Sequence, residues 1–167
     1  RLGQNRMTVE PPKDANVLLP EYTTRAAKTD RFPKTDLSPI LLGLFGEVGG
    51  IMAAVKKHRR EGHVFTSYRL DVEEDLGDAL WYFNALCTRL DVPLAALFGS
   101  SMPDGSPDAL NTLPKSLDAI LLELGEAAGH LLNVDGVGEQ ILAALQRFAA
   151  CYLSAIDAAK ISFPQVI

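Results

Sequence analysis

The chain has 167 residues, of which 47% are hydrophobic and 22% are charged, and its formal net charge is −5. A domain of this length buries about 68–70% of the surface of its unfolded chain, so its core needs no disulfide for support. The negative balance argues against general nucleic-acid binding, which needs a basic face, but it still allows a small anionic substrate.

The N-terminal region is polar and contains three prolines, so residues 1–20 are predicted to form a flexible arm. A single all-α domain is predicted over residues 21–167. Its first element is a short helix over Glu21–Arg31, followed by a turn from Pro33 to Asp36. The arm would therefore precede the folded part of the chain.

Two long helices follow. Ser38 and Pro39 are a typical start for the first, with a capping hydroxyl followed by proline at the first helical position. This helix is expected to end near Arg60, before a glycine, and the second to run from about Tyr68 to Leu90. A short helical turn is expected at Pro93–Phe98. The first helix carries an apolar stripe at steps of three and four: Leu41, Leu44, Val48, Ile51 and Val55.

Glycine, serine and proline are concentrated in residues 99–112, which we interpret as a linker. Two further helices are predicted beyond it, at about Ser116–Asn133 and Gly138–Lys160. No strand alternation is evident, so the fold class is all-α and resembles a four-helix bundle. Leu44–Ile51 resembles Glu123–His130, with Gly-Glu at the same place in both, which suggests that residues 21–98 and 113–167 are a tandem helical hairpin whose second copy is degenerate. The alternative is that any two amphipathic hairpins look alike.

Compartment and membrane contact can be inferred from the cysteines and the apolar runs. Cys87 and Cys151 lie in apolar helical stretches without a CxxC or Cys/His neighbour. They are therefore predicted to be buried thiols in a reducing compartment, although a disulfide between them stays open. No apolar run approaches the roughly 20 residues of a membrane span. A cytoplasmic protein without membrane contact is expected.

Acidic residues gather on the second long helix. At about 100° per residue, Asp71, Glu74, Asp75 and Asp78 fall within one arc of roughly 100°. Neighbouring like charges repel each other, and acids in the first helical turn are explained by the helix dipole. That explanation suits Asp71 and Glu74 but not Asp78, which lies more than two turns in. Glu47, on the first long helix, lies at the edge of an apolar stripe.

Four glycines surround Glu47 in the sequence, and each costs a helix up to about 1 kcal/mol relative to alanine. They indicate either that another backbone or a ligand approaches closely, or that the helices simply pack tightly. The four are Gly43, Gly46, Gly49 and Gly50.

Basic and aromatic residues near these acids have two interpretations each. Lys56 and Lys57 end the first long helix, where cations favour the helix dipole; the alternative is that one of them clamps the phosphates of an anionic ligand. Trp81 and Tyr82 border the acidic arc, and such aromatic rings either stack on a base or belong to the core.

Two segments carry a family resemblance: Leu-Gly-Leu-Phe-Gly-Glu-Val-Gly, ending at Gly49, and Asp-Leu-Gly-Asp-Ala-Leu-Trp-Tyr, ending at Tyr82. Together they closely resemble the MazG-type, all-α nucleoside triphosphate pyrophosphohydrolases over roughly residues 21–98. Members of that family have ExxE on one helix and ExxD on the next, and they bind Mg²⁺ between them.

The resemblance implies roles for individual residues. Glu47 would be a metal ligand or the base that orients water, and Asp75 and Asp78 would be ligands of Mg²⁺, or of Mn²⁺ in its place. Gly50 occupies the position of the second glutamate of ExxE, which leaves three matched carboxylates, with Glu74 as a substitute ligand. Mg²⁺ often needs only one or two carboxylates besides substrate phosphates, so binding of one metal ion is still expected.

The implied reaction is hydrolysis of an NTP or dNTP to the monophosphate and pyrophosphate. The implied assembly is a homodimer, or an internal pseudo-dimer in which the second half of the chain serves as the partner. The alternative is a degenerate relative that binds a nucleotide or a protein partner without hydrolysis.

Overall fold

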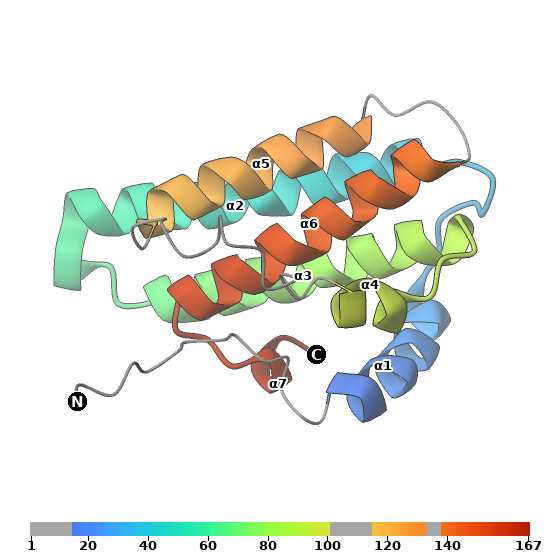
Figure 1. The fold of residues 1–167 in the computed structure, drawn as a ribbon. Coiled ribbons are helices and arrows are strands. Elements are labelled where there is room, and N and C mark those ends of the chain that lie inside the picture. The colour runs from blue at the N-terminus through green and yellow to red at the C-terminus, as the bar shows by residue number, and fades with distance from the viewer. Residues whose placement is uncertain (1–14, 101–114, 133–137) are drawn as a thin grey trace, which may run out of the picture.

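The computed structural model describes residues 15–100, 115–132 and 138–167, and the regular elements in these ranges are all helices. The predicted all-α class is therefore confirmed. Four long helices form a bundle (Figure 1): α2 (Ser38–Glu61), α3 (Tyr68–Arg89), α5 (Leu117–Leu132) and α6 (Glu139–Ala158).

The four helices form two hairpins that pack against each other. Helices α2 and α3 are joined by the short 3₁₀ turn η1 (Gly62–Val64) and lie against each other along their length, while α5 contacts both α2 and α6 (Figure 1). Buried aromatic rings connect the hairpins, because the ring centroids of Phe83 in α3 and Phe148 in α6 are 4.6 Å apart. The second half of the chain thus completes the core of the first.

Helix α1 (Ala15–Thr29) packs against α3 and the short helix α4 (Leu94–Ser100). It begins inside the predicted arm and continues through Pro20, which corrects the boundary expected at residue 20. The physical reason is burial: the Leu19 side chain is only 1% exposed in the core, and packing outweighs the unfavourable helix propensity of proline. The rest of the predicted arm, residues 1–14, lies outside the described residues.

The ends of α2 show what the sequence indicated and what it did not. The predicted turn is confirmed, since the amide of Asp36 donates to the carbonyl of Pro33 at 3.3 Å. The predicted Ser38 cap is wrong: Ser38 is the first helical residue, and its amide donates to the Asp36 carboxylate at 2.9 Å. At the C-terminal end, Gly62 has a φ of +58°, which glycine adopts without strain.

A short helix near the C-terminus, α7 (Phe163–Val166), was not predicted and packs against α3. Its signal was present in the sequence, because Ser162 and Gln165 form a capping box and Pro164 lies in the first turn. Most of the predicted linker lies outside the described residues, and the predicted internal repeat stays a prediction. Cys87 is a buried free thiol and Cys151 a half-buried one.

Contrary to the expectation from the sequence, two segments of the described residues are long and apolar enough, by length and composition alone, to cross a membrane: Ser38–Val64 and Glu139–Ala158. Core helices of a bundle meet the same criteria, and both segments supply core residues here. The predictions of a cytoplasmic location and of no membrane contact stay predictions.

Candidate functional site

The acidic residues of α2 and α3 come within electrostatic reach of one another across the helix pair. Burial raises the pKa of the half-buried Glu47, and repulsion from Asp78, Asp75 and Glu74 raises it further. The pKa of Asp75 is raised in the same way, by burial first and then by Glu74, Asp71 and Asp78. We call Glu47, Glu74, Asp75 and Asp78 the acidic seam.

Among the residues that the structure describes, no basic side chain relieves this repulsion. Within residues 15–100, 115–132 and 138–167, none of the four seam carboxylates forms an ion pair or a hydrogen bond. Several other acids of the same chain do have a basic partner: Asp30, Glu61, Glu73, Asp118, Glu123 and Glu126. The seam is therefore a local concentration of uncompensated negative charge.

Gly50 lies directly beside the carboxylate of Asp75. A Cβ atom added at Gly50 would lie 2.8 Å from Oδ2, 2.9 Å from Cγ and 3.0 Å from Oδ1 of Asp75. Real Cβ contacts are essentially never closer than 3.0 Å, so a side chain at position 50 and the present Asp75 rotamer exclude each other. The carboxylate from α3 thus fills space that the family resemblance gives to a glutamate from α2.

The glycines around Glu47 have different surroundings. Gly43 lies under the ring of Tyr82, so here, as at Gly50, a side chain approaches closely and not another backbone. At Gly46 and Gly49, an added Cβ atom would meet nothing within 4 Å. Close approach therefore explains two of the four glycines.

The seam fits a hard divalent cation by the chemistry of its donors, because carboxylate oxygens are the ligands that Mg²⁺ prefers. The arrangement of these side chains fits a bound cation less closely than their chemistry does. In the described part of the chain, no group of three or more Asp, Glu, His or Cys side chains stands ready to hold a metal ion. The carboxylates are neighbours, but they are not already arranged as a coordination shell.

The two lysines lie away from the seam. Lys56 comes nine residues after Glu47 in the same helix, which is about 14 Å along its axis at a rise of about 1.5 Å per residue. The Nζ atom of the exposed Lys57 lies 4.0 Å from the ring centroid of Phe65, a cation–π contact. The structure thus does not bring either lysine to the acids.

The two aromatic residues, by contrast, lie next to the seam. The indole Nε1 of Trp81 donates to the hydroxyl of Thr29 at 2.8 Å, and the rings of Phe32 and Tyr82 contact Trp81 edge to face. Burial raises the pKa of Tyr82, and the charges of Glu47 and Asp78 raise it further. Trp81 is consequently fixed in position beside the acidic residues.

An open hollow of about 370 Å³ adjoins the seam. Its walls include Glu74, Asp78 and Trp81 from α3, Tyr22 from α1 and Gln165 from α7. Glu74 and Asp78 belong to both the hollow and the seam. Tyr22 and Gln165 were not predicted as site residues. No local pattern exists for Tyr22, whereas the capping-box signature could have placed Gln165 at the start of a helix.

Helix α6 fastens α3 at the level of the seam. The hydroxyl of the fully buried Tyr152 donates to the main-chain carbonyl of Leu76 at 2.7 Å, one residue after Asp75. This hydrogen bond links the two halves of the chain across 76 residues. The backbone that carries the acids is therefore supported by the second half of the molecule.

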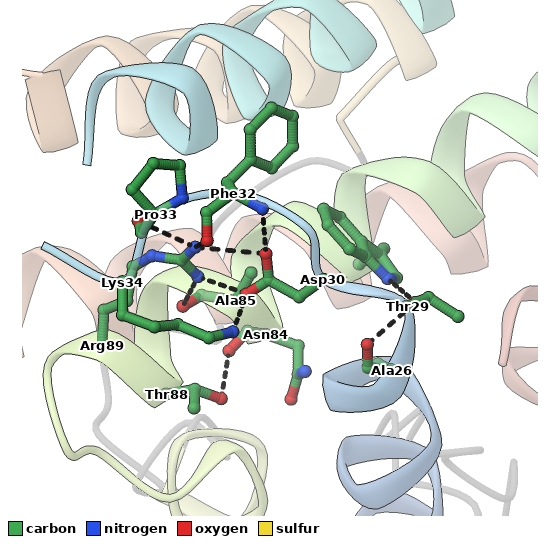
Figure 2. A network of polar contacts seen from close by, with 11 residues as sticks. Ala26, Thr29, Asp30, Phe32, Pro33, Lys34, Asn84, Ala85, Thr88 and Arg89 are labelled. Atoms are coloured by element: carbon green, nitrogen blue, oxygen red, sulfur yellow. Dashed lines mark hydrogen bonds and ion pairs between the residues drawn. The ribbon is translucent and has the colours of Figure 1, made fainter. Parts of the chain in front are cut away.

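A second polar cluster lies near the far end of α3 (Figure 2). Asp30, after α1, and Arg89, in the last turn of α3, form a bidentate ion pair with distances of 2.7 and 3.2 Å. Arg89 also donates to the carbonyls of Ala85 and Phe32. Mainly through the Arg89 hydrogen bonds, the pKa of Asp30 lies far below its usual value. This cluster ties the segment before α2 to α3.

Comparison with known proteins gives one partial relative. The chain is 40% identical over 63 residues to the protein named Gene 37 protein of Mycobacterium phage L5, a match that covers 36% of this chain and 55% of the relative. The match thus spans only about half the length of that relative, whose name indicates no chemistry. No protein-family model matches the chain, and no solved structure matches it.

Proposed function

We propose that this protein is a Mg²⁺-dependent nucleoside triphosphate pyrophosphohydrolase similar to the MazG-type enzymes. The observation that carries the proposal is the acidic seam, in which Glu47 of α2 and Asp75 and Asp78 of α3 repel one another and have no basic partner in the described part of the chain. Carboxylates whose pKa values are raised, as those of Glu47 and Asp75 are, are costly to the fold and are typical of functional sites.

The reaction assigns a role to each carboxylate. When bound, Mg²⁺ supplies positive charge that neutralises the triphosphate and polarises its phosphorus–oxygen bonds. Asp75 and Asp78 would hold the cation, and Glu47 orients a water molecule and accepts its proton. The water oxygen forms a bond to the α-phosphorus, the bond from that phosphorus to the α–β bridging oxygen breaks, and pyrophosphate leaves with the electron pair.

Pyrophosphate release from a panel of NTPs and dNTPs, with and without Mg²⁺, tests this proposal. We expect metal-dependent turnover that falls by at least about a hundredfold in Asp78→Ala, because charge stabilisation at the reacting phosphate is a large catalytic contribution. Asp157→Ala is the matched control, since Asp157 is an exposed helical aspartate of α6. Equal turnover in both variants would remove Asp78 from the mechanism.

Cation binding has its own test, independent of turnover. A ligand that binds only the folded state at 100 times its Kd stabilises that state by about 2.7 kcal/mol. We expect Mg²⁺ to raise the melting temperature of the parent and to have little effect on Asp78→Ala. A rise of the same size in both proteins would place the cation elsewhere.

A second function is favoured by Gly50 and by the lack of a ready coordination shell in the described residues. On this alternative, the protein is a catalytically degenerate relative that binds a nucleotide or a protein partner. Calorimetry would then show nucleotide binding, and prolonged incubation would give no pyrophosphate.

The proposed assembly is an internal pseudo-dimer, with α5 and α6 packed where a second chain would supply helices, or else a homodimer. The contacts of α5 with α2 support the first arrangement. Light scattering distinguishes the two, because a pseudo-dimer has the mass of one chain.

A further inference from the structure

The hollow beside the seam is built from three parts of the chain that are far apart in sequence. The half-buried Tyr22 of α1 and Trp81 of α3 provide two aromatic walls, and Gln165 of α7 and the following Ile167 provide a third side. Its volume of about 370 Å³ lies within the range of about 300–1,000 Å³ that is common for small-molecule sites.

The walls are held in place without a ligand. Trp81 is fixed by its hydrogen bond to Thr29 and by two edge-to-face ring contacts. Gln165 accepts hydrogen bonds from the amide and hydroxyl of Ser162, and its Nε2 lies 3.3 Å from a carboxylate oxygen of Glu73. A rigid aromatic surface loses little entropy when it binds a planar partner.

Gly77 lets α7 come close to the floor of the hollow. A Cβ atom there would lie 3.3 Å from the main-chain oxygen of Val166, which is tighter than most real contacts. The third wall therefore depends on a residue without a side chain.

The polar lining offers hydrogen-bond acceptors and no cation. Among the lining residues, Glu74 and Asp78 are ionisable acids without a partner, and none is a lysine, arginine or histidine. Such a wall repels phosphate and attracts N–H groups. Burial and the nearby charge of Asp78 raise the pKa of Tyr22, so its hydroxyl stays protonated.

We propose that the hollow binds the nucleobase of the substrate and prefers bases with an exocyclic amino group. The side chains of Trp81 and Tyr22 contact the faces and the edge of the base, and the carboxylate of Glu74 accepts a hydrogen bond from its amino group. Asp78, which the hollow shares with the seam, marks where the sugar and phosphates leave the hollow towards Glu47. This inference rests on the proposed function and adds a substrate class to it.

The test uses the fluorescence of Trp81, which is the single tryptophan of the chain. Nucleosides lack phosphates, so their binding is measured without metal or turnover. We expect cytidine to quench this fluorescence with about tenfold higher affinity than uridine. The two nucleosides differ mainly by an amino group in cytidine where uridine has a carbonyl, and a hydrogen bond from that amino group to a charged acceptor is worth about this factor in affinity. Equal affinities for cytidine and uridine would overturn the proposal. Quenching by tetramethylammonium but by neither nucleoside would also overturn it.

Variants locate the binding site. Tyr22→Leu keeps the reporter and should weaken cytidine binding by about tenfold, in line with the loss of one aromatic contact. Tyr68→Leu is the matched control, because Tyr68 stacks on His58 and does not line the hollow. Glu74→Ala should bring the affinities for cytidine and uridine close together. Melting temperatures of all variants show whether each one is folded.

Failure of this inference differs from failure of the proposed function. Turnover of nucleotides with the same KM in Tyr22→Leu and the parent would leave hydrolysis intact and remove the hollow as the base site. Quenching by cytidine without turnover of any nucleotide would keep the base site and remove the enzymatic proposal.

Discussion

Helix α3 carries two acidic environments of opposite kind, one along its first half and one at its last turn. Near its end, Arg89 pairs with Asp30; their side chains are 2% and 4% exposed, and the pKa of Asp30 lies far below its usual value. In the first half, burial raises the pKa of Asp75, and the charges of Glu74, Asp71 and Asp78 raise it further.

The difference shows how the same residue type can either stabilise or destabilise the folded state. A buried carboxylate with a bidentate arginine is satisfied, and losing either partner would leave an unpaired buried charge. An unpaired group of carboxylates lowers the stability of the folded state until something positive binds. The first environment is therefore expected to be structural, and the second to bind a ligand.

Breaking the Asp30–Arg89 pair should have the largest effect. Arg89→Met leaves Asp30 buried with only the exposed Lys34 as a basic partner, and we expect a loss of about 3 kcal/mol in the free energy of unfolding, measured by denaturant titration. Arg60→Met is the control, since Arg60 pairs with Glu61 at the surface and its loss should cost much less stability. Similar losses in the two variants would mean that burial of the pair does not matter.

Placing a glutamate at position 50, where the family resemblance would put one, sharpens the contrast within the seam. We expect Gly50→Glu to lose about 1–2 kcal/mol of stability, because the new side chain displaces the Asp75 carboxylate and adds another negative charge. A double-mutant cycle with Asp75→Ala measures the coupling and should recover part of the loss. Tighter Mg²⁺ binding by the single variant would contradict this expectation, since it would mean that both carboxylates can be accommodated.

Neutralising Asp75 should change the free energy of unfolding least. The change should be stabilising, whereas loss of the Asp30–Arg89 pair is destabilising. Because the folded-state pKa values of Glu47 and Asp75 are raised, their penalty is absent at low pH and grows as pH rises above about 4. Asp75→Asn should therefore be more stable than the parent by about 0.5 kcal/mol at pH 7 and nearly equal to it at pH 4, by thermal unfolding without metal ions.

The contribution of Asp30 has the reverse dependence. Its folded-state pKa is lowered, so the pair stabilises the protein fully above about pH 4 and less as pH falls further. If Asp75→Asn were less stable than the parent at pH 7, the seam would contain a favourable interaction of Asp75, and the contrast between the two regions would be lost.

Local patterns in the chain were enough to place α2 and α3 and the acids that they carry. Periodic apolar residues, Pro39 and Gly62 are local signals, and they placed α2 and α3 to within a residue or two of the observed ends. The spacing of Asp75 and Asp78 likewise put both on one side of α3, because helical geometry fixes the angle between them. Propensity misjudged α1, where packing outweighed Pro20.

The partners that these residues meet could not be predicted, because they depend on how the whole molecule packs. The Asp30–Arg89 pair joins residues 59 apart, and the Tyr152 hydrogen bond to Leu76 joins residues 76 apart. Only the structure shows that the Asp75 carboxylate occupies the space beside Gly50 that a side chain there would need. Such contacts follow from how the helices cross and which faces they bury. The packing of the complete core determines these crossings, and it leaves no periodic pattern in the sequence.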